Sequence, residues 1–166
     1  MSKSSAGCLA AASLMLCAAA AQALDRVPVL SLEVAQTMSR TCETLAKVKG
    51  WRMNIAVVDA GTNLIAFSRM DQAFLGSTDI AISKAKFSGS FPFSTRYAGE
   101  LTFGKDGKPA PVPGLADIPG VVTFAGGLPI MVAGVQVGGI GVSGGSPDED
   151  EQCAAAAIDA VKDSLK

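Results

Sequence analysis

The chain of 166 residues contains no histidine, and its aromatic side chains are few, with one Trp, one Tyr and seven Phe. Histidine is the commonest metal ligand and the commonest general base near neutral pH. Its absence argues against a Ser-His-Asp hydrolase and against a zinc enzyme. Charged residues make up only 17% of the chain and form no basic run, which argues against nucleic acid as a partner.

The N-terminus has the features of an export signal. Met1–Ala23 contains Lys3, an apolar segment around Leu9–Ala21, and small residues in the pattern of a cleavage site at its end. The pattern predicts a signal peptide over residues 1–23 and a single mature domain over 24–166. We expect that domain to be periplasmic or secreted, with no membrane segment after cleavage; an uncleaved anchor is the alternative.

The mature chain keeps two of the four cysteines. Cys8 and Cys17 leave with the predicted signal, and Cys42 and Cys153 remain in the predicted first and last helices. An exported compartment permits a disulfide between them. Each also falls on the apolar face of its helix, so two buried free thiols are the alternative.

Hydrophobic periodicity and turn residues predict an α+β fold with a largely antiparallel sheet covered by helices. A first helix capped by Ser31 and ended by Gly50 precedes two hairpin strands. A second helix capped by Ser77 or Thr78 follows. The remaining expected segments are a short helix or irregular stretch over Phe93–Phe103, a surface loop over Lys105–Pro119, a strand beginning at Gly120–Phe124, hairpin strands over Leu128–Val132 and Val135–Val142, and a C-terminal helix.

The glycine-rich stretch before the last helix contains a literal G-x-G-x-x-G, from Gly139 to Gly144. A dinucleotide site would need a second strand–helix unit and an acidic residue about 20 residues further on. The helix that follows is too near the end of the chain and opens with acidic residues, which repel a pyrophosphate. Ser146 and Glu149 instead predict a capping box.

The same glycines predict a flat surface on the last strand. Strand alternation places Val137, Gly139 and Gly141 on one face. Glycines inside a strand usually mark a close approach of another backbone. We therefore expect a packed helix or a ligand against this face.

Two groups of charged residues are candidates for function. Arg69 and Asp71, two positions apart at the end of a strand, could fix a loop or a ligand, or form a surface ion pair. Lys84 lies near Lys86 on the apolar side of the second helix. It must reach solvent, pair with a carboxylate such as Asp59 or Asp71, or hold an anionic ligand group.

A third group is aromatic and gathers within 17 positions, with Arg96 among its members. An apolar aromatic surface beside a cation suits a flat ligand that bears carboxylates. Plain core or a subunit interface is the alternative. The group comprises Phe87, Phe91, Phe93, Tyr97 and Phe103.

Several separate motifs, in order along most of Leu30–Lys166, closely resemble the GlcG/HbpS-like haem-binding family, which includes the C-terminal domain of PduO-type proteins. They are Asn54-Ile-Ala-Val-Val-Asp-Ala-Gly61, Leu64-Ile-Ala-Phe-Ser-Arg-Met-Asp71, Ala81-Ile-Ser-Lys-Ala85, Gly126-Gly-Leu-Pro-Ile130 and Val137-Gly-Gly-Ile-Gly-Val-Ser-Gly-Gly145.

The resemblance implies a profilin-like fold, with a central five-stranded antiparallel sheet flanked by N- and C-terminal helices and a middle helix. It implies assembly into homo-oligomers. It also implies binding of haem or a related tetrapyrrole in some members, sometimes linked to haem and iron handling or to redox sensing. It also marks the loop from Arg69 to Asp71, Lys84, and the turn containing Gly127 and Pro129. Since histidine is absent, an axial iron ligand would have to be Met, Tyr, Lys, Cys or a weak oxygen donor such as Thr.

These features support three hypotheses. The first is an exported, oligomeric, non-catalytic haem-binding protein, with haem near the aromatic segment and Arg96, Lys84 or Lys86 near its propionates. The second is a binder of a small anionic ligand, or an enzyme, that uses Arg69, Asp71 and Lys84 on an organic acid. The third is an accessory subunit whose aromatic stripe is an interface.

Overall fold

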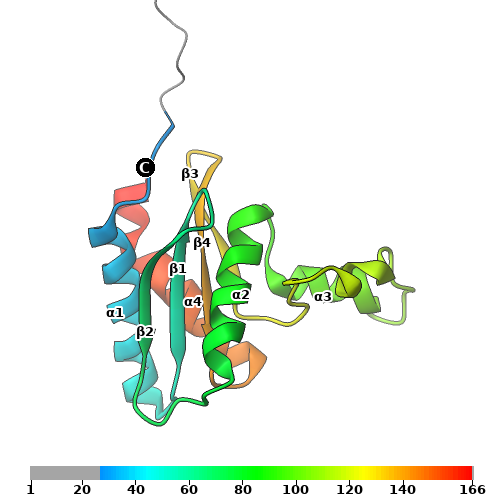
Figure 1. Cartoon of the computed structure of the whole chain (residues 1–166), viewed down its shortest axis with the longest axis horizontal. Helices are drawn as coiled ribbons and strands as arrows, with labels where there is room; N and C mark the ends of the chain where they lie inside the picture. The colour runs from blue at the N-terminus through cyan, green and yellow to red at the C-terminus, as the bar shows by residue number, and fades with distance from the viewer. Residues whose placement is uncertain (1–26, 166) are drawn as a thin grey trace, which may run out of the picture.

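The computed structural model describes residues 27–165, so the predicted signal peptide lies outside the described residues. Four helices and a four-stranded antiparallel sheet make up the fold (Figure 1). None of the described helices is long and apolar enough to cross a membrane. The elements are α1 Leu32–Lys49, β1 Asn54–Asp59, β2 Leu64–Arg69, α2 Ser77–Ser90, α3 Thr95–Phe103, β3 Gly127–Val132, β4 Val135–Ser143 and α4 Pro147–Val161, with short 3-10 turns at Pro113–Asp117 and Lys162–Leu165.

The sheet has the strand order β2-β1-β4-β3 and separates two layers of helices. Helices α1 and α4 cover one face, where most of the core lies, and α2 covers the other. Residues 92–122, here called the α3 lobe, contain α3 and extend away from the sheet beyond α2 (Figure 1). The α+β class and the antiparallel sheet are as the sequence predicts.

Helix α1 begins and ends where the sequence indicates. The Ser31 hydroxyl accepts a hydrogen bond from the Val34 N–H at 3.2 Å, and Gly50 ends the helix with a φ of 76°. The N-terminus of α2 differs from the prediction, because its N-cap is Gly76 and no side chain caps it. Ser77 is buried, and the Thr78 hydroxyl lies 3.3 Å from Asn54 Oδ1. Both side chains therefore contact neighbouring parts of the fold and do not cap the helix.

A β-bulge in β4 changes which side chains face which layer. Ile130 pairs with Gly138 but Met131 pairs with Gln136, so Val137 is the extra residue. Val137 packs in the core under α1 and α4. The prediction that it shares a face with Gly139 is wrong, because the bulge reverses the alternation at that point. Gln136 consequently faces α2, and its Nε2 donates to the Phe91 carbonyl at 3.1 Å.

Beyond the bulge, Gly139 and Gly141 face α2 as the sequence predicts. A Cβ on Gly141 would lie 2.1 Å from the Ala81 carbonyl oxygen, and one on Gly139 would lie 2.4 Å from that of Ala85. The helix backbone therefore rests directly on the strand. This contact occupies the face that a nucleotide would need, and the glycines serve helix packing.

Helix α4 begins with the predicted capping box. The Ser146 hydroxyl accepts from the Glu149 N–H, and the Glu149 carboxylate accepts from the Ser146 N–H at 2.8 Å. On the neighbouring edge strand β3, Pro129 pairs with Gly139. Proline is tolerated there because an edge strand leaves one row of backbone groups without a neighbouring strand. The structural roles of these residues follow the sequence.

The expected strand beginning at Gly120–Phe124 does not form, and the described residues contain four strands where the resemblance implies five. Val121 instead packs with Phe87, Ala98 and Leu115 in a small cluster between α2 and the α3 lobe. A Cβ added to Gly99 would lie only 2.3 Å from the Thr123 carbonyl oxygen. The segment is held against α3, so it does not extend the sheet.

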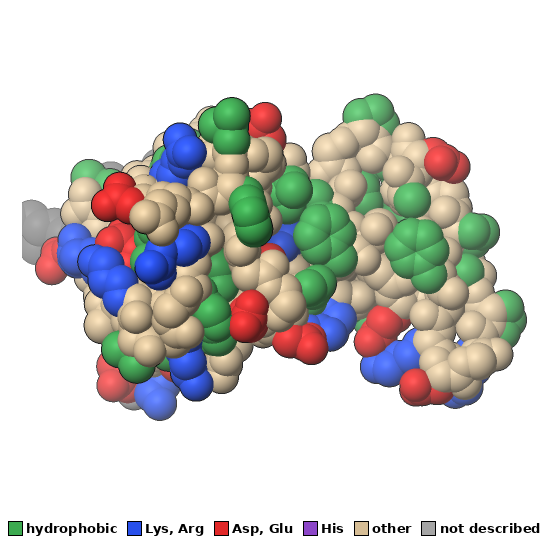
Figure 2. All heavy atoms as spheres, turned by 90° about the horizontal axis from the view of Figure 1, so that it is seen from below, with side chains coloured by type: hydrophobic (Ala, Val, Ile, Leu, Met, Phe, Trp, Pro, Cys, Tyr) green, Lys and Arg blue, Asp and Glu red, His purple; other side chains and the backbone are tan. Residues whose placement is uncertain are grey.

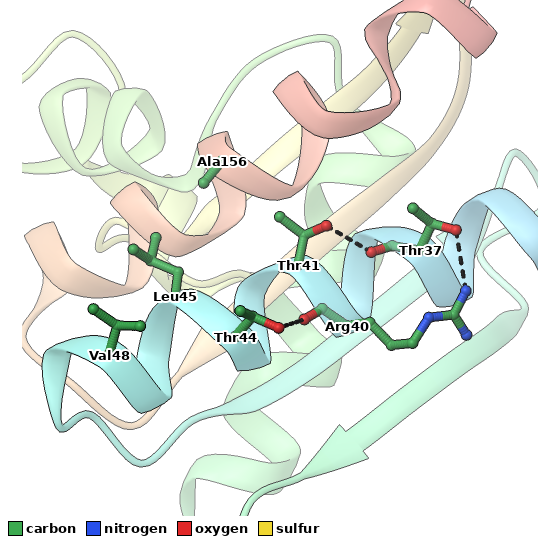
Figure 3. Close-up of a pocket in the computed structure, with 7 residues that line it drawn as sticks. All are labelled: Thr37, Arg40, Thr41, Thr44, Leu45, Val48 and Ala156. Carbon is green, nitrogen blue, oxygen red and sulfur yellow. Dashed lines mark hydrogen bonds between the residues drawn. The ribbon is translucent and has the colours of Figure 1, made fainter.

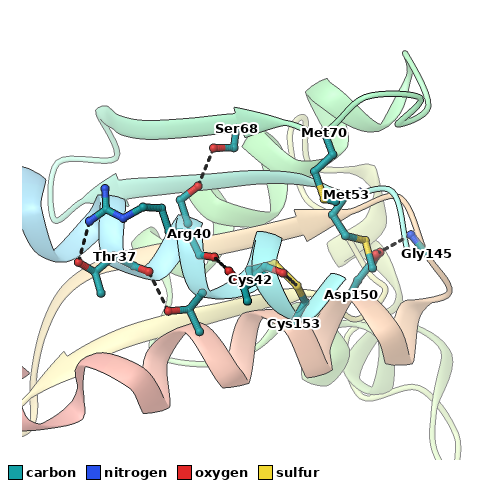
Figure 4. Close-up of a disulfide and its surroundings, with 12 residues drawn as sticks. Thr37, Arg40, Cys42, Met53, Ser68, Met70, Gly145, Asp150 and Cys153 are labelled. Atoms are coloured by element: carbon teal, nitrogen blue, oxygen red, sulfur yellow. Dashed lines mark hydrogen bonds between the residues drawn. A yellow bond between two sulfur atoms is a disulfide. The ribbon is translucent and has the colours of Figure 1, made fainter. Parts of the chain in front are cut away.

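A disulfide joins Cys42 of α1 to Cys153 of α4, with an S–S distance of 2.03 Å (Figure 4). Both cysteines are fully buried. The predicted disulfide is confirmed, and the alternative of two free thiols is wrong. The bond closes 111 residues of sequence, so it restricts the unfolded chain strongly.

We predict that Gly141→Ala destabilises the protein by about 1–3 kcal/mol or more, because its Cβ would collide with the backbone of α2. Gly114→Ala is the matched control, since Gly114 has no heavy atom within 4 Å of the added Cβ, and it should change stability by less than about 0.5 kcal/mol. Urea unfolding measures both. Equal stabilities of the two variants would contradict the close contact.

Candidate functional site

Four aromatic side chains form a continuous cluster between α2 and α3. The ring centroid of Phe91 lies 4.8 Å from that of Phe87 and 5.4 Å from that of Phe93, and Phe93 lies 5.4 Å from Tyr97. These distances are typical of favourable aromatic pairs. We call Phe87, Phe91, Phe93 and Tyr97 the aromatic cluster.

The cluster runs from the core to the surface. Phe87 is 4% exposed, whereas Phe91 is 38% and Tyr97 is 47% exposed. Helix α2 ends at Ser90 and the chain turns at once into α3, where the Ser94 hydroxyl accepts from the Tyr97 N–H at 3.1 Å. This cap fixes Tyr97 in the first turn of α3, at the outer end of the cluster.

The α3 lobe exposes further apolar side chains. Phe103 is 71% exposed and Ile118 is 52% exposed. Figure 2, which views the molecule from below, shows hydrophobic side chains, rings among them, exposed toward the right, where the α3 lobe lies. Apolar side chains exposed together on one lobe are typical of an interaction site.

Arg96 lies on α3 but is directed to the start of α4. Its Nε donates to Glu151 at 2.9 Å, and its Nη2 donates to Asp148. The hydrogen bonds to Asp148 and Glu151 raise the pKa of Arg96. The guanidinium therefore ties the α3 lobe to α4 and is already shared by two carboxylates.

Lys84 is completely buried, and its ammonium contacts three groups. Its Nζ donates to the Asp150 carboxylate of α4 and to the Val142 carbonyl of β4, each at 2.8 Å. It also lies 4.6 Å from the ring centroid of Phe124, within the range of a cation–π contact. The predicted carboxylate partner exists, but it is Asp150, and not Asp59 or Asp71.

Burial disfavours the charged forms of Lys84 and Asp150. Desolvation lowers the pKa of Lys84 and raises the pKa of Asp150, while the attraction between the two groups acts in the opposite direction on each. The Gly145 N–H also donates to Asp150 at 2.9 Å (Figure 4). Lys84 thus has its hydrogen bonds inside the protein, whereas Lys86 is exposed on α2.

Arg69 and Asp71 lie at the other end of α2 from the aromatic cluster. Both are exposed and line a hollow with a volume of about 550 Å³ together with residues of α1 and of the α1–β1 connection. Lys84 is not among the residues that line it. The structure therefore does not bring Arg69, Asp71 and Lys84 together.

A shallow groove of about 640 Å³ follows the outer surface of α1 toward Ala156 of α4 (Figure 3). Thr37, Thr41 and Thr44 line it, and each hydroxyl donates to a carbonyl one turn earlier in α1. The groove is completed by Leu45, Val48 and Arg40, whose guanidinium donates to the Thr37 hydroxyl at 3.1 Å. Since the threonine hydroxyls are bonded to the helix itself, the groove offers mainly apolar groups.

Three residues with important contacts were not found by sequence reasoning. Asp150 holds Lys84, Gln136 holds the end of α2, and the buried Thr95 hydroxyl accepts from the Gly127 N–H at 2.9 Å. Asp150 had a detectable signal, because it shares helical spacing with the buried Cys153 and Ala157. Gln136 and Thr95 depend on contacts that no local pattern indicates.

Within residues 27–165, no group of three or more Cys, Asp or Glu side chains is placed to hold a metal ion.

We predict that Lys84→Met costs about 3–5 kcal/mol, because it leaves the buried Asp150 carboxylate without its counter-charge and with only the Gly145 N–H as a donor. The double variant Lys84→Met, Asp150→Leu removes both charges and should recover most of that loss. Urea unfolding of the parent protein, the single variant and the double variant measures these changes in the free energy of unfolding. If the single variant lost less than about 1 kcal/mol, the pair would not be an important constraint.

Comparison with known proteins identifies the relatives of this fold. A protein of 15.0 kDa from Citrobacter freundii, described as uncharacterized, is 31% identical over 142 residues, which cover 81% of this chain and 94% of the relative. The crystal structure of a variant of HbpS from Streptomyces reticuli is 34% identical, covers 87% of this chain and 94% of its own, and superposes with a TM-score of 0.75.

A third relative was crystallised with a ligand. The structure of PduOC in complex with haem is 27% identical to this chain, with a TM-score of 0.72, and the match covers 80% of this chain and 95% of that one. The family model described as "Haem degrading protein HbpS-like" matches residues 30–159. The chain therefore belongs to the HbpS-like family, as its sequence motifs indicate.

Proposed function

We propose that this protein is an exported, homo-oligomeric haem-binding protein and that haem lies against the exposed end of the aromatic cluster. The observation that carries the proposal is the solvent-exposed apolar surface around Phe91 and Tyr97. A porphyrin is a large, flat, apolar ring, and stacked aromatic side chains match it. Membership of the family and the haem complex of PduOC support the choice of ligand.

The residues at this surface also fit an iron ligand and a propionate partner. Cys42 and Cys153 are both in the disulfide, and Lys84 is buried with Asp150. Tyr97 is an oxygen donor at the exposed end of the cluster, and we propose it as the iron ligand because tyrosine ligates haem iron in catalase. Lys86 is an exposed cation on α2, and Phe91 directly follows that helix. We propose Lys86 as a propionate partner, since Arg96 already binds Asp148 and Glu151.

Haem titration tests the proposal. The mature protein should give a shifted, saturable Soret band with hemin, and the spectrum should stay constant with time because we propose no turnover of haem. Phe91→Ala should weaken binding about tenfold or more, since an aromatic contact contributes about 0.5–1.5 kcal/mol beyond its buried area. Tyr97→Phe should keep most of the affinity but change the iron spectrum.

Phe74→Ala is the matched control, because Phe74 is 70% exposed and lies before the opposite end of α2. It should bind hemin as the parent protein does. The absence of a saturable Soret shift would refute the proposal. A change of mass in Phe91→Ala by light scattering, with hemin binding unchanged, would favour the interface hypothesis instead.

Export and assembly are tested on one preparation. Expressed with its full N-terminus, the protein should be recovered from the periplasm or medium with the intact mass of residues 24–166, and it should show no free thiol after denaturation. Light scattering should give a multiple of the monomer mass, because exposed side chains such as Phe103 would be covered in an oligomer. A protein that retains Met1 would contradict cleavage of the signal peptide. A monomer would contradict assembly into an oligomer.

A further inference from the structure

The hollow beside Arg69 is lined by five charged side chains from three segments. Lys47 and Glu43 come from the last turns of α1, Arg52 from the α1–β1 connection, and Arg69 and Asp71 from the end of β2 and the turn after it. Its volume of about 550 Å³ is within the range of small-molecule sites. In Figure 2, which views this end of the molecule, basic side chains gather with fewer acidic ones toward the left.

The turn that carries two of these side chains is fixed to the sheet. The Met70 N–H donates to the Met53 carbonyl at 3.0 Å, and the Ala73 N–H donates to the Met70 carbonyl at 3.1 Å. Met70 Sδ also lies 3.4 Å from the Met53 nitrogen, and the two side chains are adjacent in Figure 4. Arg69 and Asp71 flank Met70, so their backbone positions are set before any ligand arrives.

The charges in the hollow are not neutralised by one another. The ion pairs in the described part of the chain involve none of the five groups. Arg52 donates to the Trp51 carbonyl at 3.0 Å and Arg69 to the Ala73 carbonyl at 3.5 Å. A guanidinium has five N–H donors, so most donors of both arginines remain available. Three cations and two carboxylates thus line one hollow.

We propose that this hollow binds a small carboxylate that also carries a hydrogen-bond donor, namely a hydroxy acid or an amino acid. The arginines offer the planar forks that pair with a carboxylate, and Lys47 adds a point charge. Glu43 and Asp71 accept hydrogen bonds from a ligand hydroxyl or ammonium group. The same two carboxylates repel a dianion such as phosphate, which makes it a poorer ligand. The site is separate from the proposed haem surface.

Trp51 is the single tryptophan, and its carbonyl accepts from Arg52, which lines the hollow, so we expect its fluorescence to change when Arg52 binds a ligand; calorimetry measures the same binding directly. The mature, disulfide-bonded protein is titrated with L-lactate, L-serine and propionate at constant ionic strength. We expect a saturable change with L-lactate or L-serine, and binding of propionate about tenfold weaker or more, since propionate lacks the donor. No saturable response to either of the first two, or an equal response to propionate, would overturn the proposal.

Variants distinguish a specific binding site from a general electrostatic attraction of anions. Arg69→Ala and Arg69→Lys should each weaken binding about tenfold or more, because the lysine cannot reproduce the guanidinium fork. Lys49→Ala is the matched control, since Lys49 is an exposed cation at the same helix end but does not line the hollow. An equal loss in Lys49→Ala and Arg69→Lys would refute the site. Hemin titration of Arg69→Lys should be unchanged, so failure here leaves the haem proposal intact.

Discussion

The buried ammonium of Lys84 joins α2, β4 and α4 at one point, and the arrangement of the layers depends on it. It bonds Val142 and Asp150, which lie 58 and 66 positions away in the sequence. Removing a charged group from water is costly, and only a partner charge and hydrogen bonds in good geometry offset the cost. Gly141 makes the arrangement possible, because a Cβ there would lie 2.9 Å from the Lys84 Cβ. The glycine and the lysine therefore form one packing unit.

This unit fixes α2 against the sheet, and the ends of α2 define the two proposed binding surfaces. The aromatic cluster lies at the C-terminal end of α2, and the turn with Arg69 and Asp71 precedes the N-terminal end of α2. A helix of 14 residues is about 21 Å long, so the two surfaces are separate. The disulfide acts on the other side of the sheet, where it holds α1 to α4. Each layer is thus fixed by a buried link that is distant in sequence.

Much of the local structure follows from nearby residues. The caps of α1, the capping box of α4, and the turn at Ala133–Gly134 all depend on groups within a few positions of one another. The helical spacing of Cys42 and Cys153 also placed both on buried faces. The first residue of α2 was predicted incorrectly, because Ser77 is drawn into packing and leaves Gly76 as the N-cap. Residues 120–124 were expected to be extended, but contacts with α3 hold them outside the sheet.

The sequence by itself determined the α+β class, the first and last helices, the two hairpins and the glycine face of β4, because periodicity, capping and turn chemistry are local properties. The family followed separately, from the resemblance of several motifs. Only the tertiary structure decided that Asp150 is the partner of Lys84 and that Arg96 binds α4. It also decided that Val137 turns into the core. Charge pairing across 66 residues and a one-residue bulge depend on how the layers meet, and the spacing of residues along the chain does not encode that geometry.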